Sequence, residues 1–83
     1  MSQREFMIVL AHSENCGMCR AKLLNDAAAL LASRSLTEEE KAVLSRLKHE
    51  DFLTPDILSR AAKVGRDELE RYSGEPVVRL RHL

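Results

Sequence analysis

Aromatic residues are almost absent from this 83-residue chain, which has two phenylalanines, one tyrosine and no tryptophan. Aromatic and β-branched residues favour strands, whereas alanine and leucine favour helices. Alanine and leucine fill most apolar positions here. The composition therefore argues against an all-β fold and predicts a mainly α-helical protein.

Cysteine, net charge and long apolar segments are also lacking. Two cysteines cannot form the disulfide framework of a small secreted protein. Thirteen basic and thirteen acidic residues cancel, so no overall field attracts nucleic acid or an acidic membrane. The apolar run at residues 6–11 is too short for a signal-peptide core or a membrane span. These absences predict a cytoplasmic protein with reduced thiols and no membrane contact.

The length predicts one small domain, residues 1–83, with a thin core. Hydrophobic residues make up 45% and charged residues 31% of the chain, a balance typical of globular proteins and not of disordered ones. Small domains often gain stability from a metal, a partner or a second copy of themselves. Homodimer formation therefore stays open.

Helix signals recur along the middle of the chain. Residues 18–33 place apolar side chains at three- and four-residue steps, at Met18, Ala21, Leu24, Ala28 and Leu31. Thr37 and Glu40 form a capping-box signature for a second helix. Thr54 followed by Pro55 predicts the start of a third, and a break at residues 64–65 precedes a fourth at residues 66–73.

The two ends of the chain are ambiguous. Residues 6–11 fit a buried strand or a short buried helix, because an unbroken apolar run has no periodicity that separates the two. Residues 77–83 alternate in part and fit a strand that pairs with residues 5–11. The predicted fold is a small bundle of about four helices, with a short two-stranded pairing of the terminal segments as an option.

Reactive side chains concentrate in one stretch, where His12, Cys16 and Cys19 are spaced H-x3-C-x2-C. Two thiols three residues apart, with a histidine nearby, are ligands that zinc accepts. Gly17 lies inside the motif, and residues 12–17 are predicted to form a turn. The pattern predicts a zinc site that stabilises a thin core.

This motif resembles the signature of the zinc-binding anti-sigma factors, in which the second cysteine opens a helix. The match covers His12, Cys16 and Cys19, with residues 19–24 similar to the start of that helix. The resemblance implies a regulatory protein of bacterial or phage transcription that acts through protein–protein contact. In that family the fourth ligand comes from a helix upstream of the motif, whereas here none of the eleven residues before His12 is Cys or His.

The fourth zinc ligand is predicted to be His49, with His82 as the second choice. Helices joined by short loops pack antiparallel, so the end of the second helix should return towards the start of the first. If neither histidine reaches the site, Glu14, a water or a second chain must close it. The predicted metal ligands are thus His12, Cys16, Cys19 and His49.

Two other interpretations of the cysteines are kept. An apolar run followed by C-x2-C and a helix resembles the start of a thioredoxin or glutaredoxin domain, which implies a thiol–disulfide oxidoreductase. That fold needs about four strands, whereas residues 18–73 favour helices. Alternatively, both cysteines are small buried apolar residues with no ligand role.

Residues 54–74 resemble the helix-turn-helix of bacterial repressors, with Lys63 at the turn position that is usually glycine. This implies a DNA-binding protein that uses residues 54–73. The outer face of the second helix would carry three acids and two bases, and phosphates repel such a surface. Nucleic-acid binding would depend on four arginines: Arg66, Arg71, Arg79 and Arg81.

No carboxylate pair, Ser/His/Asp arrangement or phosphate-binding loop is present, so we do not expect an enzyme. The favoured prediction is a cytoplasmic zinc-binding regulatory module whose partner is another protein, a component of transcription control. The DNA-binding protein and the oxidoreductase are the alternatives.

Overall fold

The computed structural model describes residues 3–32 and 34–79, and over these ranges the chain is mainly helical and contains no strand. The elements are α1 (Gln3–Asn15), α2 (Gly17–Asn25), α3 (Ala27–Leu31), α4 (Glu38–Arg46), the 3-10 turn η1 (His49–Phe52), α5 (Pro55–Ala62), α6 (Arg66–Ser73) and α7 (Pro76–Arg79). The predicted mainly α class is confirmed. No helix in these ranges has the length and apolar content that crossing a membrane requires.

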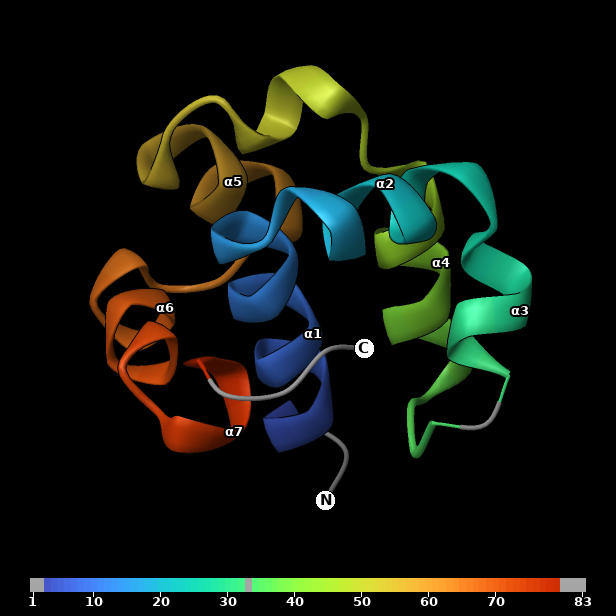
Figure 1. Ribbon diagram of the computed structural model, residues 1–83, viewed down its shortest axis with the longest axis horizontal. Coiled ribbons are helices and arrows are strands. Elements are labelled where there is room, and N and C mark those ends of the chain that lie inside the picture. The colour runs from blue at the N-terminus through green and yellow to red at the C-terminus, as the bar shows by residue number, and fades with distance from the viewer. Residues whose placement is uncertain (1–2, 33, 80–83) are drawn as a thin grey trace.

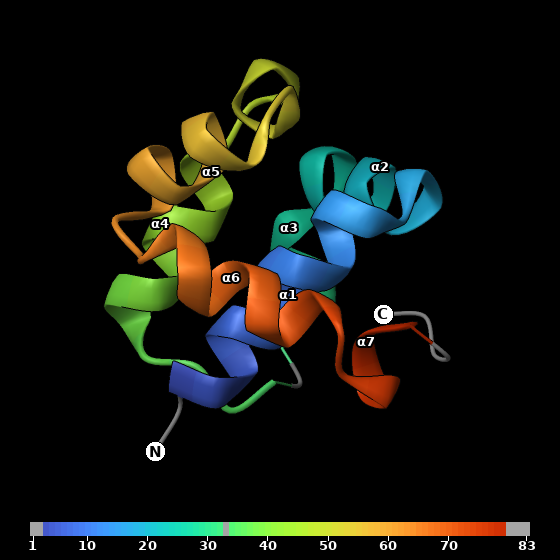
Figure 2. The ribbon, with the colours of Figure 1, turned by 90° about the vertical axis from the view of Figure 1, so that its left-hand side faces the viewer.

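Helix α1 is the centre of the fold (Figure 1). Helices α2, α3 and α4 lie on one side of it and α5, α6 and α7 on the other, and the view turned by 90° shows α6 crossing α1 (Figure 2). Every residue from 6 to 13 is buried, and α1 contacts α2, α6 and α7. A helix surrounded by neighbours needs apolar residues on all sides, which explains the unbroken apolar run.

The optional pairing of the terminal segments as strands is wrong. Residues 5–11 belong to α1, and residues 77–79 belong to α7, which packs on α1 as a short helix with Val78 buried. Since α1 forms its backbone hydrogen bonds internally, it offers no free edge to a strand. Residues 80–83 lie outside the described part of the chain.

The three predicted helix starts in the second half of the chain are confirmed. Thr37 accepts a hydrogen bond from the Glu40 backbone N–H (3.1 Å), and the Glu40 side chain accepts one from the Thr37 N–H (2.9 Å), which completes the capping box of α4. The Thr54 hydroxyl accepts a hydrogen bond from the Ile57 backbone N–H (3.2 Å) at the start of α5, and α6 spans the predicted residues 66–73. These elements form as predicted because their signals lie within a single turn.

The helix predicted over residues 18–33 differs from the structure in two respects. It breaks at Asp26, whose backbone leaves the helical region (φ −147°, ψ 61°), so that α2 and α3 are separate. Its predicted inner face is also misplaced at the start. Cys19 and Leu23 are buried, whereas Met18 and Ala21 are exposed, because the buried stripe runs through a cysteine that the apolar pattern did not include.

Candidate metal centre

The motif residues lie where α1 ends and α2 begins, not in the predicted turn. His12 is in the last turn of α1, Cys16 is the N-cap residue of α2, and Cys19 is in the first turn of α2. Only Cys16 is extended (φ −126°, ψ 111°), and its N–H still donates to the His12 carbonyl at 2.9 Å. The prediction of a turn over residues 12–17 is therefore wrong, because the connection uses a single non-helical residue.

The spacing of the two cysteines has a simple geometric meaning. Cys16 and Cys19 occupy the N-cap and N3 positions of α2, the same pair of positions that a capping box uses. Side chains at these positions lie next to each other at the start of the helix. The positive end of the helix dipole lies there as well, and thiolate is the form of cysteine that binds metal.

His12 completes a group of three. One ligand atom from each of His12, Cys16 and Cys19 lies within 4.8 Å of the other two. A tetrahedral zinc ion, with bonds of about 2.0 Å to nitrogen and 2.3 Å to sulfur, holds its ligand atoms about 3.5–3.8 Å apart. Small side-chain rotations bring these three atoms to that separation, so the donors present fit a zinc ion.

The group is largely shielded from water. His12 is 2% exposed and Cys19 is 1% exposed, whereas Cys16 is half-buried. Within this group, Cys16 is therefore the residue most accessible to solvent. Because the ligands come from both α1 and α2, a bound ion would tie the central helix to the outer layer.

His49, the predicted fourth ligand, does not belong to this group. It is exposed and begins η1. The antiparallel argument misplaced it because the chain leaves α4 in an extended conformation at Leu47 (ψ 145°) and continues into η1, which packs on α5. The second choice, His82, lies outside the described residues.

Glu14, the acidic alternative, is directed elsewhere. Its Oε1 accepts a hydrogen bond from the Ser73 hydroxyl of α6 at 3.5 Å, and it is not among the residues gathered with His12. Burial raises the pKa of the Glu14 carboxyl, a rise that the Ser73 hydrogen bond partly offsets. Its Oε2 is buried without a hydrogen-bond partner in the described part of the chain. Glu14 thus faces the contact between α1 and α6.

The helix-turn-helix candidate has the expected backbone. Lys63 adopts the left-handed conformation (φ 58°, ψ 45°) after α5, as the turn requires. Its N–H donates to the Arg60 carbonyl and the Val64 N–H to the Ser59 carbonyl, which is a Schellman motif. The turn therefore forms without glycine.

Both arginines on the outer face of α6 are already paired with carboxylates. Arg66 forms ion pairs with Asp56 (3.0 Å) and Glu70 (3.3 Å), and Arg71 lies 3.9 Å from Glu68. These carboxylates compete with phosphates for the two arginines. Of the other predicted arginines, Arg79 ends α7 and Arg81 lies outside the described residues.

Comparisons with known proteins do not place this chain in a family. No family model, curated protein or solved structure matches the chain. The thioredoxin-like alternative lacks its scaffold, because residues 3–32 and 34–79 contain no strand of the sheet that such a domain needs.

One feature of the surface was missed by the sequence pattern. An open apolar groove runs along the outer side of α2 and α3, and its lining includes Met18, Ala21, Ala29 and Leu30. The pattern assigned Met18 and Ala21 to the core. If Cys19 and Leu23 had been taken to define the buried side of α2, Met18 and Ala21 would have been predicted to be exposed.

Proposed function

We propose that this chain is a small zinc-binding regulatory module in which His12, Cys16 and Cys19 hold the ion. The observation that carries the proposal is the approach of their three ligand atoms to within 4.8 Å at the junction of α1 and α2. Zinc bound there has a structural role. It joins the central helix to α2, and its binding free energy is of the same order as the stability of a small domain.

The fourth ligand in this proposal is His82. The chain has three histidines; His12 is in the group and His49 is exposed outside it. His82 follows the end of α7, a helix packed on α1, by three residues, and three extended residues span at most about 10 Å. A His2Cys2 set suits tetrahedral zinc.

We further propose that the module acts by contacting another protein in transcription control. Support comes from the likeness of H-x3-C-x2-C to the motif of the zinc-binding anti-sigma factors. It also comes from the net charge of zero, which provides no overall electrostatic attraction for nucleic acid. The backbone of α5 and α6 favours DNA binding as the second candidate, but the paired charges on α6 weigh against it.

Metal analysis tests the first proposal. Protein purified without added metal or a histidine-rich tag should contain about one zinc per chain, and a chelator should lower its melting temperature sharply. Cys16→Ser and Cys19→Ser should each reduce the zinc content and make melting insensitive to chelator. The control is Ser45→Ala, an exposed substitution on α4, which should keep both properties. Parent protein that contains no zinc and melts identically with chelator would refute the site.

A further inference from the structure

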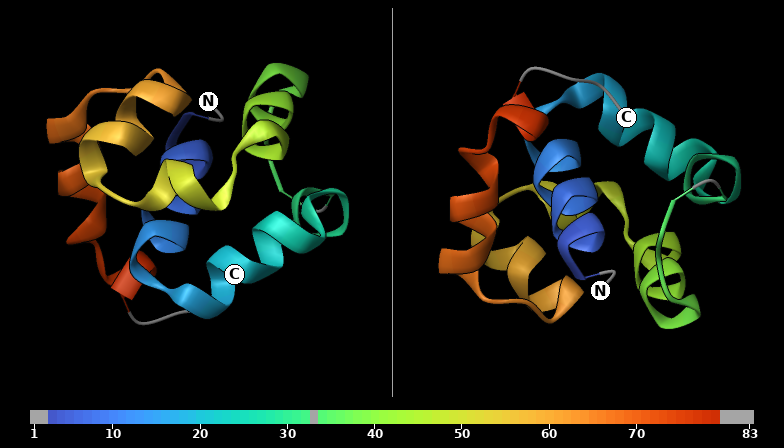
Figure 3. Two further views of the ribbon diagram at one scale, coloured as in Figure 1. Left: turned by 90° about the horizontal axis from the view of Figure 1, so that it is seen from above. Right: turned by 90° about the horizontal axis from the view of Figure 1, so that it is seen from below.

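Helices α2 and α3 follow each other along one edge of the molecule (Figure 3). Residues of both helices line an open groove. The groove has a volume of about 640 Å³ and is wide open to solvent. Its apolar lining includes Met18, Ala21, Ala29 and Leu30, with Lys22 and Asp26 beside them. A concave apolar surface of this kind on a small protein marks a place where another molecule binds.

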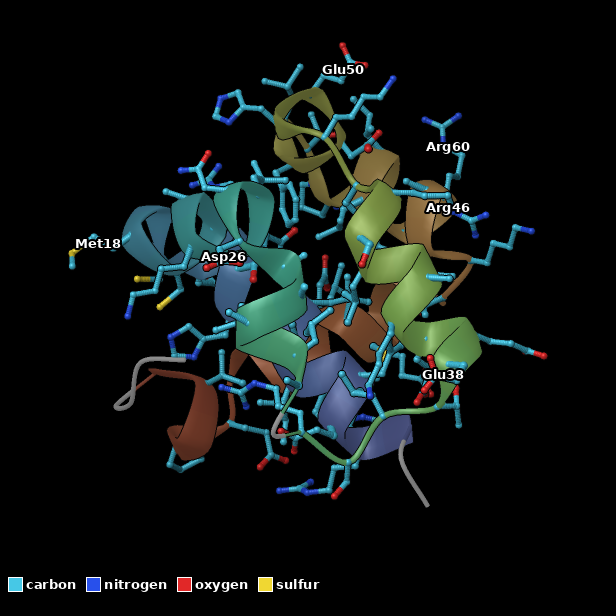
Figure 4. The ribbon with its side chains drawn as sticks, turned by 90° about the vertical axis from the view of Figure 1, so that its right-hand side faces the viewer. Met18, Asp26, Glu38, Arg46, Glu50 and Arg60 are labelled. Carbon is cyan, nitrogen blue, oxygen red and sulfur yellow. The ribbon has the colours of Figure 1, made fainter. Side chains whose placement is uncertain are left out.

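Met18 is the most exposed large apolar side chain in the described part of the chain, at 71%. It points away from the protein at one end of this edge, and Asp26 lies further along the same side (Figure 4). Exposing an unbranched thioether to water is unfavourable, and methionine adapts well to a partner's surface. The side chain is therefore placed to insert into a partner.

We propose that a second copy of the chain occupies this groove, with the two α2–α3 edges packed antiparallel about a two-fold axis. The axis passes through the groove, midway between Lys22 and Asp26. In such an isologous interface each contact occurs twice, because residue i of one copy meets residue j of the other and the reverse.

Charge complementarity argues for a second copy as the occupant. Lys22 and Asp26 both line the groove and carry opposite charges, so a two-fold axis through the point midway between them places each opposite the other residue of the second copy. Neither side chain makes an ion pair within the described part of the chain. Two intermolecular pairs would satisfy four otherwise unpaired charges.

The apolar residues of the groove come from both helices. Met18 belongs to α2 and Leu30 to α3, so antiparallel packing of the two edges brings Met18 of one copy towards Leu30 of the other. Ala21 and Ala29 are small and allow the helices to approach closely. The net charge of zero adds no long-range repulsion between copies. The surface is therefore complementary to itself in polarity and charge.

This inference goes beyond the proposed function and does not depend on the bound metal. Cys19 lies on the buried side of α2, whereas the groove lies on the exposed side. If the protein contains no zinc, the proposal of a dimer is unaffected. If the protein is monomeric, the proposal of a zinc site is unaffected.

Sedimentation equilibrium of the full chain tests the interface. The parent protein should sediment with twice the mass of one chain as its concentration is raised. Ala29→Arg should weaken the dimer by at least about tenfold, because it places a long charged side chain in the groove. Ala42→Arg is the matched control on the exposed side of α4 and should leave the dimer intact. Equal melting temperatures of the two variants would show that both are folded.

Charge exchange tests the register. Lys22→Asp and Asp26→Lys should each weaken the dimer, since each places like charges opposite one another twice. The double variant restores both pairs with the signs exchanged and should regain parental affinity. A parent protein that stays monomeric up to submillimolar concentration would overturn the proposal. A double variant no stronger than the single variants would overturn the two-fold register on which it rests.

Discussion

At the scale of the residue, the site depends on which positions of two helices the ligands occupy. Cys16 and Cys19 are at the N-cap and N3 positions of α2, and His12 is one turn before Cys16 in α1. Each position is set by a local helix boundary, so the three side chains meet without any long-range pairing. A short motif can therefore build most of a metal site in a chain as small as this one.

Single histidine replacements distinguish the histidines that bind zinc from those that do not. His12→Ala and His82→Ala should each weaken zinc binding by at least about tenfold, since loss of a direct ligand should cost no less than the 10–100-fold typical of outer-shell changes. His49→Ala should bind zinc like the parent protein, because His49 is exposed outside the group. Competition with a chelator of known affinity measures all three. Parental affinity in His82→Ala would show that a water, an acid or a second chain closes the site.

At the scale of the element, the turn between α5 and α6 places Lys63 in a left-handed backbone conformation that disfavours residues with a Cβ. Lys63 is the one residue other than glycine with positive φ in the described part of the chain. The left-handed conformation crowds the Cβ of an L-residue, and glycine avoids this cost. The Schellman motif at the end of α5 nevertheless needs that conformation.

Glycine at this turn should therefore stabilise the protein. Lys63→Gly is expected to raise the free energy of unfolding by about 0.5–1 kcal/mol, because relief of the crowding exceeds the entropy that glycine adds to the unfolded chain. That corresponds to a melting temperature about 2–8 °C higher for a domain of this size. Lys63→Ala keeps a Cβ and serves as the control, with little change expected. Thermal unfolding that ranks glycine below alanine would contradict the turn geometry.

At the scale of the whole molecule, acidic and basic residues balance in number, and on α6 they are paired. The arginines that would contact DNA from this helix already contact Asp56, Glu68 and Glu70. Binding to a duplex would have to break these pairs, and the zero net charge supplies no attraction that compensates.

We therefore expect weak binding to duplex DNA. At physiological salt the dissociation constant should be no tighter than about 10⁻⁶ M, the stronger end of the non-specific range, and should vary little with sequence. Fluorescence anisotropy with labelled duplexes over a range of salt concentrations measures this. Affinity near 10⁻⁸ M or tighter for one sequence, about the level of a specific DNA reader, would promote the helix-turn-helix candidate above the zinc module.

Predictions from the sequence succeed where the determining contacts are local. The capping box of Thr37 and Glu40, the start of α5 at Thr54 and Pro55, and the span of α6 all depend on residues within a turn or two. The grouping of His12, Cys16 and Cys19 belongs to the same class. A chain with these signals forms these elements with little help from the rest of the fold.

Three features depended on tertiary packing. Residues 6–11 are apolar enough for a buried strand or a buried helix, and they form a helix because α2, α6 and α7 surround α1 instead of pairing beside it. The buried side of α2 depends on where α1 lies. His49 begins η1, which packs on α5, and it is not gathered with His12, Cys16 and Cys19. The sequence by itself determined the starts of α4, α5 and α6 and the grouping of three possible metal ligands, since hydrogen bonds and side chains within one or two turns decide them. The tertiary structure decided which sides face inward, because burial depends on neighbours that are distant along the chain.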